Sequence, residues 1–319
     1  MAQKTWSRSG GRTTGARCCC LPPKLLNHPQ NMSRHVLKDI SIVSANYNNA
    51  AFLDDYFQSV EDNSAWPGEL VIVDDGSTDE SPAIIRKWAA KHSWIRPVLL
   101  PDNVGVANAT NQGIAVANGT WILRVDPDDM LMPHRIQSQW DFIQQHPEVD
   151  VLGGNCVYVD GKTRQSIRTS GFPATRADIE KLFHLGENGV LNGTTLVRKT
   201  WFNRFPYRQE MVWAEDYDCF ARMLHAGAVM AAQREPNTWV RIHRESATSN
   251  LAWDTLEKAW KLSVELFNNK RTLRDVKGNF RHLQHYRRYL LSKNPIAKWW
   301  HLAAAVWWRP EKVLKAVFK

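Results

Sequence analysis

The sequence predicts an α/β fold, in which a mostly parallel sheet is flanked by helices, and three observations support this. Short apolar runs with the length of buried strands alternate with stretches of helix length through the first half of the chain. Two of these runs end abruptly in aspartates, at residues 74–75 and 126–129. Because open α/β sheets bind ligands beyond the carboxyl ends of their strands, we expect the functional site there.

The expected elements follow one another with short polar connections. Ile40 to Ser44 and Glu69 to Val73 are compact apolar runs that suit buried strands, and each precedes a stretch of helix length. The expected order is strand 40–44, helix 51–60, strand 69–73, helix 80–91, strand 94–100, helix 104–117 and strand 120–125.

After Pro147 the pattern changes to shorter strands, expected at 151–159 and 190–197, and then to a helix at 215–226. From Leu251 onward the chain is expected to be helical and is rich in aromatic residues. The predicted organisation is a main domain over 36–250 and a basic, tryptophan-rich helical extension over 251–319. Residues 1–35 are expected to form a disordered leader, with Met32 as a candidate native start.

Composition excludes several classes of protein. No run of eighteen or more uncharged apolar residues occurs, and residues 1–30 lack the apolar centre of a signal peptide. Five cysteines, three of them adjacent at 18–20, supply neither a disulfide framework nor the spaced ligands of a zinc site. We therefore expect a cytoplasmic protein.

The net charge of +9 is unevenly distributed along the chain. Residues 1–31 carry +5 and residues 270–319 carry +11, which leaves −7 for residues 32–269. An acidic centre indicates a cation-binding core, and a basic end indicates an anionic partner, either a membrane surface or nucleic acid.

The segment Asp126-Pro127-Asp128-Asp129 places three carboxylates within four residues, directly after an apolar strand. Such closely spaced carboxylates repel one another unless a hard cation neutralises them. Mg²⁺ and Mn²⁺ are bound by a few carboxylates together with substrate phosphate oxygens, which this segment could supply. The alternative is that Asp128 or Asp129 caps a helix that begins near Pro133.

The segment Asp74-Asp75-Gly76 ends the second strand. A carboxylate at this position can accept hydrogen bonds from a base N–H or a ribose hydroxyl, and Gly76 permits a tight turn. The alternative is an ordinary Asp-Gly turn.

Together these segments resemble the family 2 glycosyltransferases, which have the GT-A fold, a single nucleotide-binding α/β domain. The resemblance covers roughly residues 40–245. The chain departs from the family pattern at Ala45, where Pro is frequent, and at Thr110, where Arg is frequent. The matching segments, in order, are 40–48, 73–79, 103–105 with 111–113, and 126–129.

The resemblance implies a role for each matching position. A metal, Mn²⁺ or Mg²⁺, would be held by Asp128 and Asp129 with His243, and Arg241 would pair with a phosphate. The alternative for His243 is a structural role. The nucleotide pocket would be formed by Asn46, Tyr47, Asp74, Asp75, Asn103, Gly105, Asn111 and Asp126.

The segment Ala214-Glu215-Asp216 resembles the family's Glu-Asp motif at the start of a helix. The resemblance implies a general base for the acceptor hydroxyl, with Asp216 as the first choice and Glu215 as the second. The alternative is that both carboxylates only favour the helix N-terminus through the macrodipole.

The function implied is inverting, metal-dependent transfer of a sugar from a nucleotide-diphosphate donor, expected to be a UDP-sugar, to a hydroxyl. The acceptor would be a glycan or lipid-linked molecule in the biosynthesis of lipopolysaccharide, capsule or exopolysaccharide. A Rossmann-type nucleotide-dependent enzyme is one alternative, although residues 44–50 contain no glycine. The other is a non-catalytic protein that binds nucleic acid or membrane through its basic end.

The C-terminal extension carries Trp299-Trp300 and Trp307-Trp308, followed by Lys312, Lys315 and Lys319. Tryptophan and lysine beside an apolar stripe suit a membrane interface, so residues 295–319 are expected to make a peripheral contact with the inner face of the cytoplasmic membrane. The alternative is a helical hairpin packed on the main domain. The extension lacks a recognisable nucleic-acid motif, so no nucleic-acid partner is expected.

Overall fold

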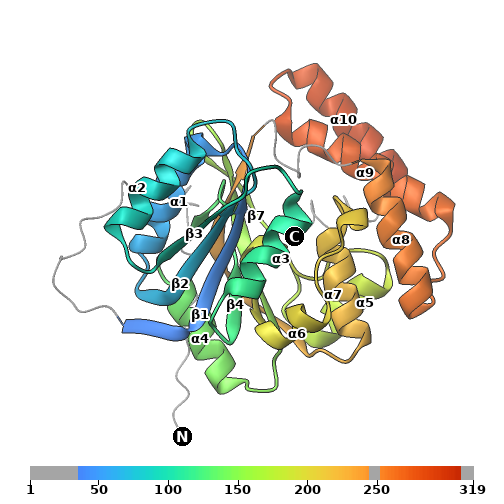
Figure 1. The fold of residues 1–319 in the computed structure, drawn as a ribbon. Helices are drawn as coiled ribbons and strands as arrows, with labels where there is room; N and C mark the ends of the chain where they lie inside the picture. Colours follow the sequence, from blue (N-terminus) through green and yellow to red (C-terminus); the bar gives the residue numbers. More distant parts are fainter. Residues whose placement is uncertain (1–34, 244–251, 310–319) are drawn as a thin grey trace, which may run out of the picture.

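The computed structural model describes residues 35–243 and 252–309, and its centre is a nine-stranded sheet (Figure 1). The strands pair in the order β3-β2-β1-β4-β8-β6-β9-β5, with β7 on β6. The first four strands of this order are parallel, and β8 joins antiparallel to both β4 and β6. The strands are β1 (His35–Asn46), β2 (Ala65–Asp74), β3 (Ile95–Leu99), β4 (Trp121–Arg124), β5 (Met130–Leu131), β6 (Val151–Asp160), β7 (Ser166–Thr169), β8 (Leu196–Arg198) and β9 (Met230–Ile242).

Helices cover both faces of the sheet because its central strands are apolar on both sides. In β2, Val71 and Val73 pack with α3, whereas the intervening Leu70 and Ile72 pack with α1 and α2. The α3 backbone lies so close to the sheet that a Cβ on Gly113 would stand 2.7 Å from Val43 Cγ1. The helices are α1 (Ala50–Glu61), α2 (Ser81–Lys91), α3 (Val106–Val116), α4 (Arg135–Gln145), α5 (Arg176–His184), α6 (Lys199–Arg204), α7 (Glu215–His225), α8 (Trp253–Phe267), α9 (Leu273–Leu291) and α10 (Pro295–Trp308).

The structure confirms the predicted α/β class and the alternating elements up to β4. The strand expected over 190–197 is wrong for most of its length. Residues Asn192–Thr194 form a 3₁₀ turn, in which Thr194 Oγ1 donates to Leu191 O at 2.7 Å, and only Leu196–Arg198 forms a strand. Local side-chain to backbone bonds of this kind compete with a strand ladder.

The C-terminal residues that the structure describes form three helices, as expected. Ala259 and Leu262 of α8 join the core beside α7. Helices α9 and α10 form an antiparallel hairpin, held by contacts such as His282 Nδ1 to Ala305 O at 2.9 Å (Figure 1). No helix among residues 35–243 and 252–309 has the length and apolar character needed to span a bilayer. The leader with Met32 and the final residues 310–319 lie outside the described residues.

A buried aspartate ties α7 to the segment before it. Asp218 is fully buried and bonds both Arg208 and Arg222, with Arg222 Nη2 at 2.7 Å. Replacing Asp218 by Ala would leave two guanidinium groups facing each other without their carboxylate. We expect this variant to lose roughly 3 kcal/mol of unfolding free energy in a urea titration. Asp254→Ala, which removes an exposed i,i+4 pair with Lys258, should change stability by less than about 1 kcal/mol. An Asp218→Ala variant as stable as Asp254→Ala would contradict the prediction.

Candidate active site

A cleft of about 350 Å³ opens beyond the carboxyl ends of β1 and β4. Its walls come from the residues after β4, from the 3₁₀ turn at 192–194, from the start of α7 and from the end of β9. Five carboxylates and two arginines line it: Asp126, Asp128, Asp129, Glu215, Asp216, Arg124 and Arg241. Such a concentration of acidic groups in one concavity suits an enzyme that handles protons or cations.

The three aspartates that follow β4 lie in one tight turn, in which Asp129 N donates to Asp126 O at 3.0 Å. The Asp129 carboxylate is buried, and its Oδ1 accepts a hydrogen bond from Arg241 N at 2.9 Å. The helix that follows begins only at Arg135, with His134 as its N-cap and without a side-chain capping bond. The capping interpretation of Asp128 and Asp129 is therefore wrong, and the aspartates remain available to the cleft.

His243 and Asp128 meet although 115 residues separate them. His243 Nε2 lies 2.9 Å from Asp128 Oδ2, because β9 places the residues that follow it beside the turn after β4. Arg241, at the end of β9, stacks over Phe52 and donates from Nη2 to Asp55 at 2.8 Å. Within the described residues, its Nε and Nη1 have no hydrogen-bond partner. These two nitrogens are therefore buried donors that lack an acceptor among the described residues, and an anion bound in the cleft would supply one.

The burial of the aspartates in the cleft and their charges on one another shift their pKa values. Burial raises the pKa of Asp126, while the Arg124 guanidinium, 3.5 Å away, lowers it and the charge of Asp128 raises it. Burial raises the pKa of Asp129 well above its ordinary value, and the charges of Asp128 and Asp126 add to this effect. A positive ligand would relieve this repulsion.

The two carboxylates at the start of α7 differ in their partners. Asp216 Oδ2 accepts from Asn188 Nδ2 at 2.9 Å, and its Oδ1 accepts from Tyr217 N at 2.6 Å. Glu215 Oε2 is buried and has no hydrogen-bond partner within the described part of the chain. Burial, and after it the neighbouring charge of Asp216, raise the pKa of Glu215 to about 7. Burial also raises the pKa of Asp216.

Of the residues expected to bind the nucleotide, Asp126 lines the cleft and the others do not. Asp74 Oδ1 accepts from Asn46 Nδ2 at 2.7 Å, which joins the ends of β1 and β2. Asp75 accepts from Val104 N at 2.7 Å and from Gly105 N at 3.0 Å. Gly105, with φ of 87°, adopts a backbone conformation that favours glycine. These bonds fix the loops beside the cleft.

Three further positions predicted for the nucleotide make different contacts. The Asn111 side chain bonds both the N–H and the carbonyl of Tyr207, at 3.0 and 2.8 Å, and so anchors a segment 96 residues away. The Asn103 carboxamide oxygen accepts from Gly105 N at 3.2 Å, and Tyr47 is about half exposed beyond the end of β1.

The sequence reasoning missed several residues that line the cleft. Arg124 is almost completely buried and donates from Nη1 to Val43 O, so its guanidinium is held beside Asp126. Tyr207 donates its hydroxyl to Asn192 at 2.7 Å in the opposite wall. Trp213 is exposed and has a φ of 70°, which is uncommon for a bulky residue. Of these three residues, Arg124 alone had a local signal in the sequence, because it is a charged residue within an apolar strand.

The mostly parallel sheet and the acidic cleft at its carboxyl edge define an α/β protein with a ligand site where open α/β sheets bind their ligands. Residues 41–213 match the model of glycosyl transferase family 2, so the chain belongs to this family and is a glycosyltransferase. The family membership decides against the Rossmann-type and non-catalytic alternatives.

Similar proteins agree with this assignment. An uncharacterized glycosyltransferase of Haemophilus influenzae is 29% identical over 213 residues, which cover 66% of this chain and 82% of the relative. The amylovoran biosynthesis glycosyltransferase AmsE of Erwinia amylovora is 24% identical over 70% of this chain and 82% of its own. The crystal structure of S. aureus TarS residues 1–349 with UDP-GlcNAc superposes with a TM-score of 0.59 at 19% identity, covering 86% of this chain and 82% of that one. The GT-A fold is thereby confirmed.

Proposed function

We propose that this glycosyltransferase is inverting and metal-dependent, and that it moves a sugar from a UDP-sugar to a hydroxyl of a glycan or lipid-linked acceptor. The observation that carries the proposal is a cleft lined by Asp128, Arg241 and the carboxylates Glu215 and Asp216, in which His243 contacts Asp128 from beside the wall. AmsE is named for amylovoran biosynthesis and TarS was crystallised with UDP-GlcNAc, which supports a UDP donor and a surface-glycan product. The proposed place of reaction is the cytoplasm.

A divalent cation, Mn²⁺ or Mg²⁺, fits the residues of the cleft. Asp128 and His243 offer an oxygen and a nitrogen that already lie 2.9 Å apart. Burial raises the pKa values of Asp126 and Asp129, and the charge of Asp128 raises both further, so a cation beside them would stabilise their ionised forms. Among residues 35–243 and 252–309, no three acidic, His or Cys side chains are close enough to hold an ion alone. Substrate phosphate oxygens would complete the shell around Asp128 and His243, with Asp129 nearby. When bound, the cation offsets charge on the departing diphosphate.

Side chains of the protein bind the donor phosphate and remove the acceptor proton. Within the part of the chain that the structure describes, Arg241 has two nitrogens without an acceptor, Nε and Nη1, and we assign it the binding of a donor phosphate oxygen. A carboxylate at the start of α7, which we assign as Asp216, takes the proton from the acceptor hydroxyl. The acceptor oxygen then bonds to the anomeric carbon from the face opposite the leaving group. The bond from this carbon to the diphosphate oxygen breaks, and the nucleotide diphosphate leaves with its electron pair. One such displacement inverts the anomeric centre.

The residues at the ends of β1 and β2 are proposed to receive the nucleoside. Asn46, Tyr47, Asp74 and Asp75 lie at the same edge of the sheet as the cleft, and Asn103, Gly105 and Asn111 shape the adjoining loop and helix. Their existing bonds give this edge a fixed shape, which favours selective base recognition over a loose contact.

Titration calorimetry with UDP tests the proposed donor site. We expect UDP to bind in the presence of Mn²⁺ and to bind at least about tenfold more weakly in EDTA, because the phosphates then lack their cation. UDP release from a panel of UDP-sugars would identify the sugar, and proton NMR of the product would show the anomeric configuration. Failure of UDP to bind with any divalent cation would contradict the proposal, and a GDP titration would show whether another base is preferred.

A further inference from the structure

Helix α10 turns an apolar face away from the rest of the protein. Ile296, Trp299, Trp300 and Trp307 expose 82%, 71%, 60% and 83% of their surface, and their spacing places them along one side of the helix. The opposite side packs on α9, where Ala305 is fully buried. Trp300 also meets His285 of α9 edge to face at 5.2 Å, but most of its surface and that of Trp299 and Trp307 remains in water.

This face is continuous and hollowed. Trp299, Leu302, Ala303, Val306 and Trp307 line a shallow groove of about 380 Å³ with almost no polar surface. Monomeric proteins rarely expose a contiguous apolar patch without using it to bind something. Transfer of large aromatic side chains from water to an apolar environment is favourable, so a partner that covers this face would gain binding free energy.

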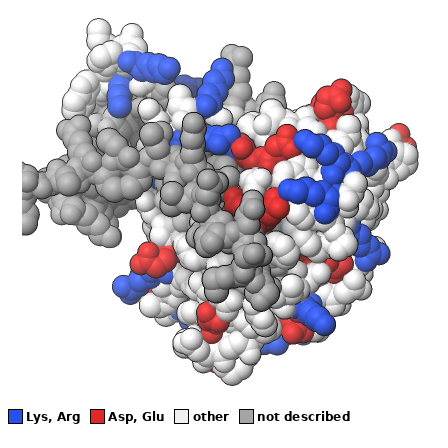
Figure 2. Space-filling model, turned by 90° about the vertical axis from the view of Figure 1, so that its left-hand side faces the viewer, with Lys and Arg blue, Asp and Glu red and all other residues white. Residues whose placement is uncertain are grey.

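Exposed cations of α9 lie beside the end of α10, where Arg274 lines a cavity with Trp307 and Trp308, and Lys277 and Arg281 line a pocket with Trp308. Arg274, Lys277 and Arg281 of α9 are all exposed, and from residue 273 to residue 309 the only carboxylate is Asp275. Elsewhere the surface is mixed: over most of the face in Figure 2, Lys and Arg side chains lie beside Asp and Glu. The hairpin therefore carries a positive charge that its own acids do not neutralise.

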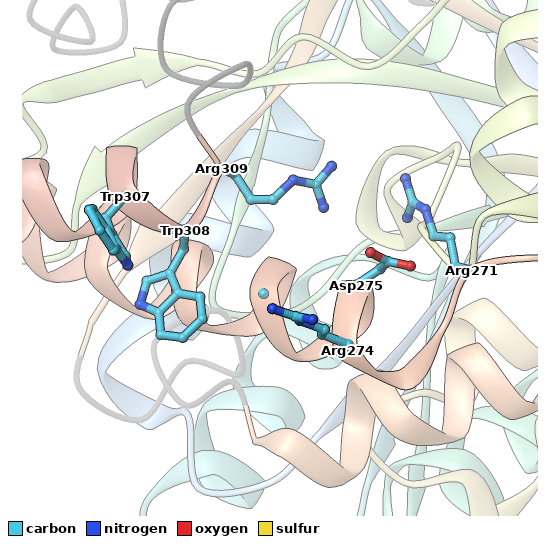
Figure 3. A pocket seen from close by; sticks show the side chains of 7 residues that line it. Arg271, Arg274, Asp275, Trp307, Trp308 and Arg309 are labelled. Atoms are coloured by element: carbon cyan, nitrogen blue, oxygen red, sulfur yellow. The ribbon is translucent and has the colours of Figure 1, made fainter.

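Cations and tryptophans meet in a cavity of about 650 Å³ between the start of α9 and the end of α10. Figure 3 shows Arg271, Arg274 and Arg309 around this cavity, with Trp307 and Trp308 at one side. Arg271 is bonded to Glu187 at 2.6 Å. Among the described residues, Arg274 has no carboxylate within 4.0 Å, so its guanidinium is available to an anionic group.

We propose that the α9–α10 hairpin docks the enzyme on an anionic phospholipid membrane surface. The tryptophan face of α10 would enter the interface between headgroups and acyl chains, where an indole places its ring in the apolar layer and its N–H in water. Arg274, Lys277 and Arg281 would lie against lipid phosphates. The cavity between Arg274 and Trp308 has the chemistry to hold one headgroup phosphate.

Charge favours a lipid surface over a second copy of the chain. Two hairpins meeting through α10 would bring two sets of cations together, with one carboxylate on each side, and would repel one another. An anionic membrane satisfies both the apolar and the basic parts of the surface. This inference stands apart from the proposed sugar transfer, because binding to a membrane is measured without turnover.

Vesicle co-sedimentation of the full chain tests the proposal. We expect binding to vesicles of phosphatidylglycerol mixed with phosphatidylcholine, little binding to pure phosphatidylcholine, and release at high salt. Arg274→Glu should weaken partitioning roughly 30-fold, since reversing one charge changes the attraction by about twice the 1 kcal/mol that each cation contributes. The double variant Trp299→Ala, Trp307→Ala should lose at least about tenfold.

Lys87→Glu is the matched control, because it reverses an exposed cation on α2, outside the hairpin. We expect this variant to bind vesicles as the unmodified chain does. Circular dichroism of each variant would show that the helices are retained. Equal binding to neutral and anionic vesicles, equal loss in Lys87→Glu, or no binding at all would overturn the proposal. Concentration-dependent self-association that the tryptophan variant abolishes would overturn it in favour of a second copy.

Discussion

Replacing Asp216 by Asn is expected to lower kcat about 10²- to 10⁴-fold, while leaving donor binding within about threefold of the unmodified enzyme. The proposed role of Asp216 is proton removal from the acceptor hydroxyl, which Asn cannot perform. The carbonyl oxygen of Asn can still accept from Tyr217 N. Its NH₂ group would replace the oxygen that accepts from Asn188 Nδ2, and it can donate to the Asn188 carboxamide oxygen once that amide turns over, so the start of α7 should keep its shape. Initial rates of UDP release with a saturating acceptor would measure the effect.

Glu215→Gln is the matched variant, and the pair separates two assignments of the base. Burial and the neighbouring charge of Asp216 raise the pKa of Glu215 to about 7, so this side chain is predominantly a carboxylate only above that pH. A protonated Glu215 cannot accept a proton from the acceptor. If Glu215 is the base, kcat/KM should therefore fall as the pH is lowered through 7. With Asp216 as the base, Glu215→Gln should lose less than about tenfold in kcat. A loss above 10²-fold in Glu215→Gln, with Asp216→Asn nearly active, would move the role to Glu215.

The second large effect is expected at the metal site. Asp128→Ala should weaken UDP binding in Mn²⁺ about 100-fold or more, because it removes a ligand from a shell of few protein groups. His243→Ala, which removes the other half of the 2.9 Å pair, should weaken binding by about 10- to 100-fold. Calorimetry with UDP at several Mn²⁺ concentrations would measure both variants.

Asp160→Ala is the control for these titrations. Asp160 is an aspartate whose carboxylate bonds Lys162 N and Thr163 N in a surface turn, so its loss should leave nucleotide binding unchanged. If EDTA weakens UDP binding to the unmodified chain but Asp128→Ala does not, the cation is held elsewhere. If neither EDTA nor Asp128→Ala affects UDP binding, the proposed metal dependence is wrong.

The sequence was sufficient for the fold and for the parts of the cleft that are local in the chain. Strand and helix alternation depends on apolar periodicity within short windows, which is why β1 to β4 and α1 to α3 agree with the prediction. Asp126, Asp128 and Asp129 could be placed at a carboxyl edge because they directly follow an apolar run. The prediction of a strand over 190–197 was wrong because the conformation there depends on hydrogen bonds from the Thr194 side chain and not on apolar periodicity.

Contacts between segments that are distant in the sequence were decided only by the tertiary structure. The order β6-β9-β5 at one side of the sheet brings His243 to Asp128 and the Arg241 backbone to Asp129, 112 residues apart. Likewise, packing against α9 decides which side of α10 is buried and leaves Trp299 and Trp307 in water. Local periodicity carries no information on strand order or helix orientation, because many arrangements bury the same apolar residues.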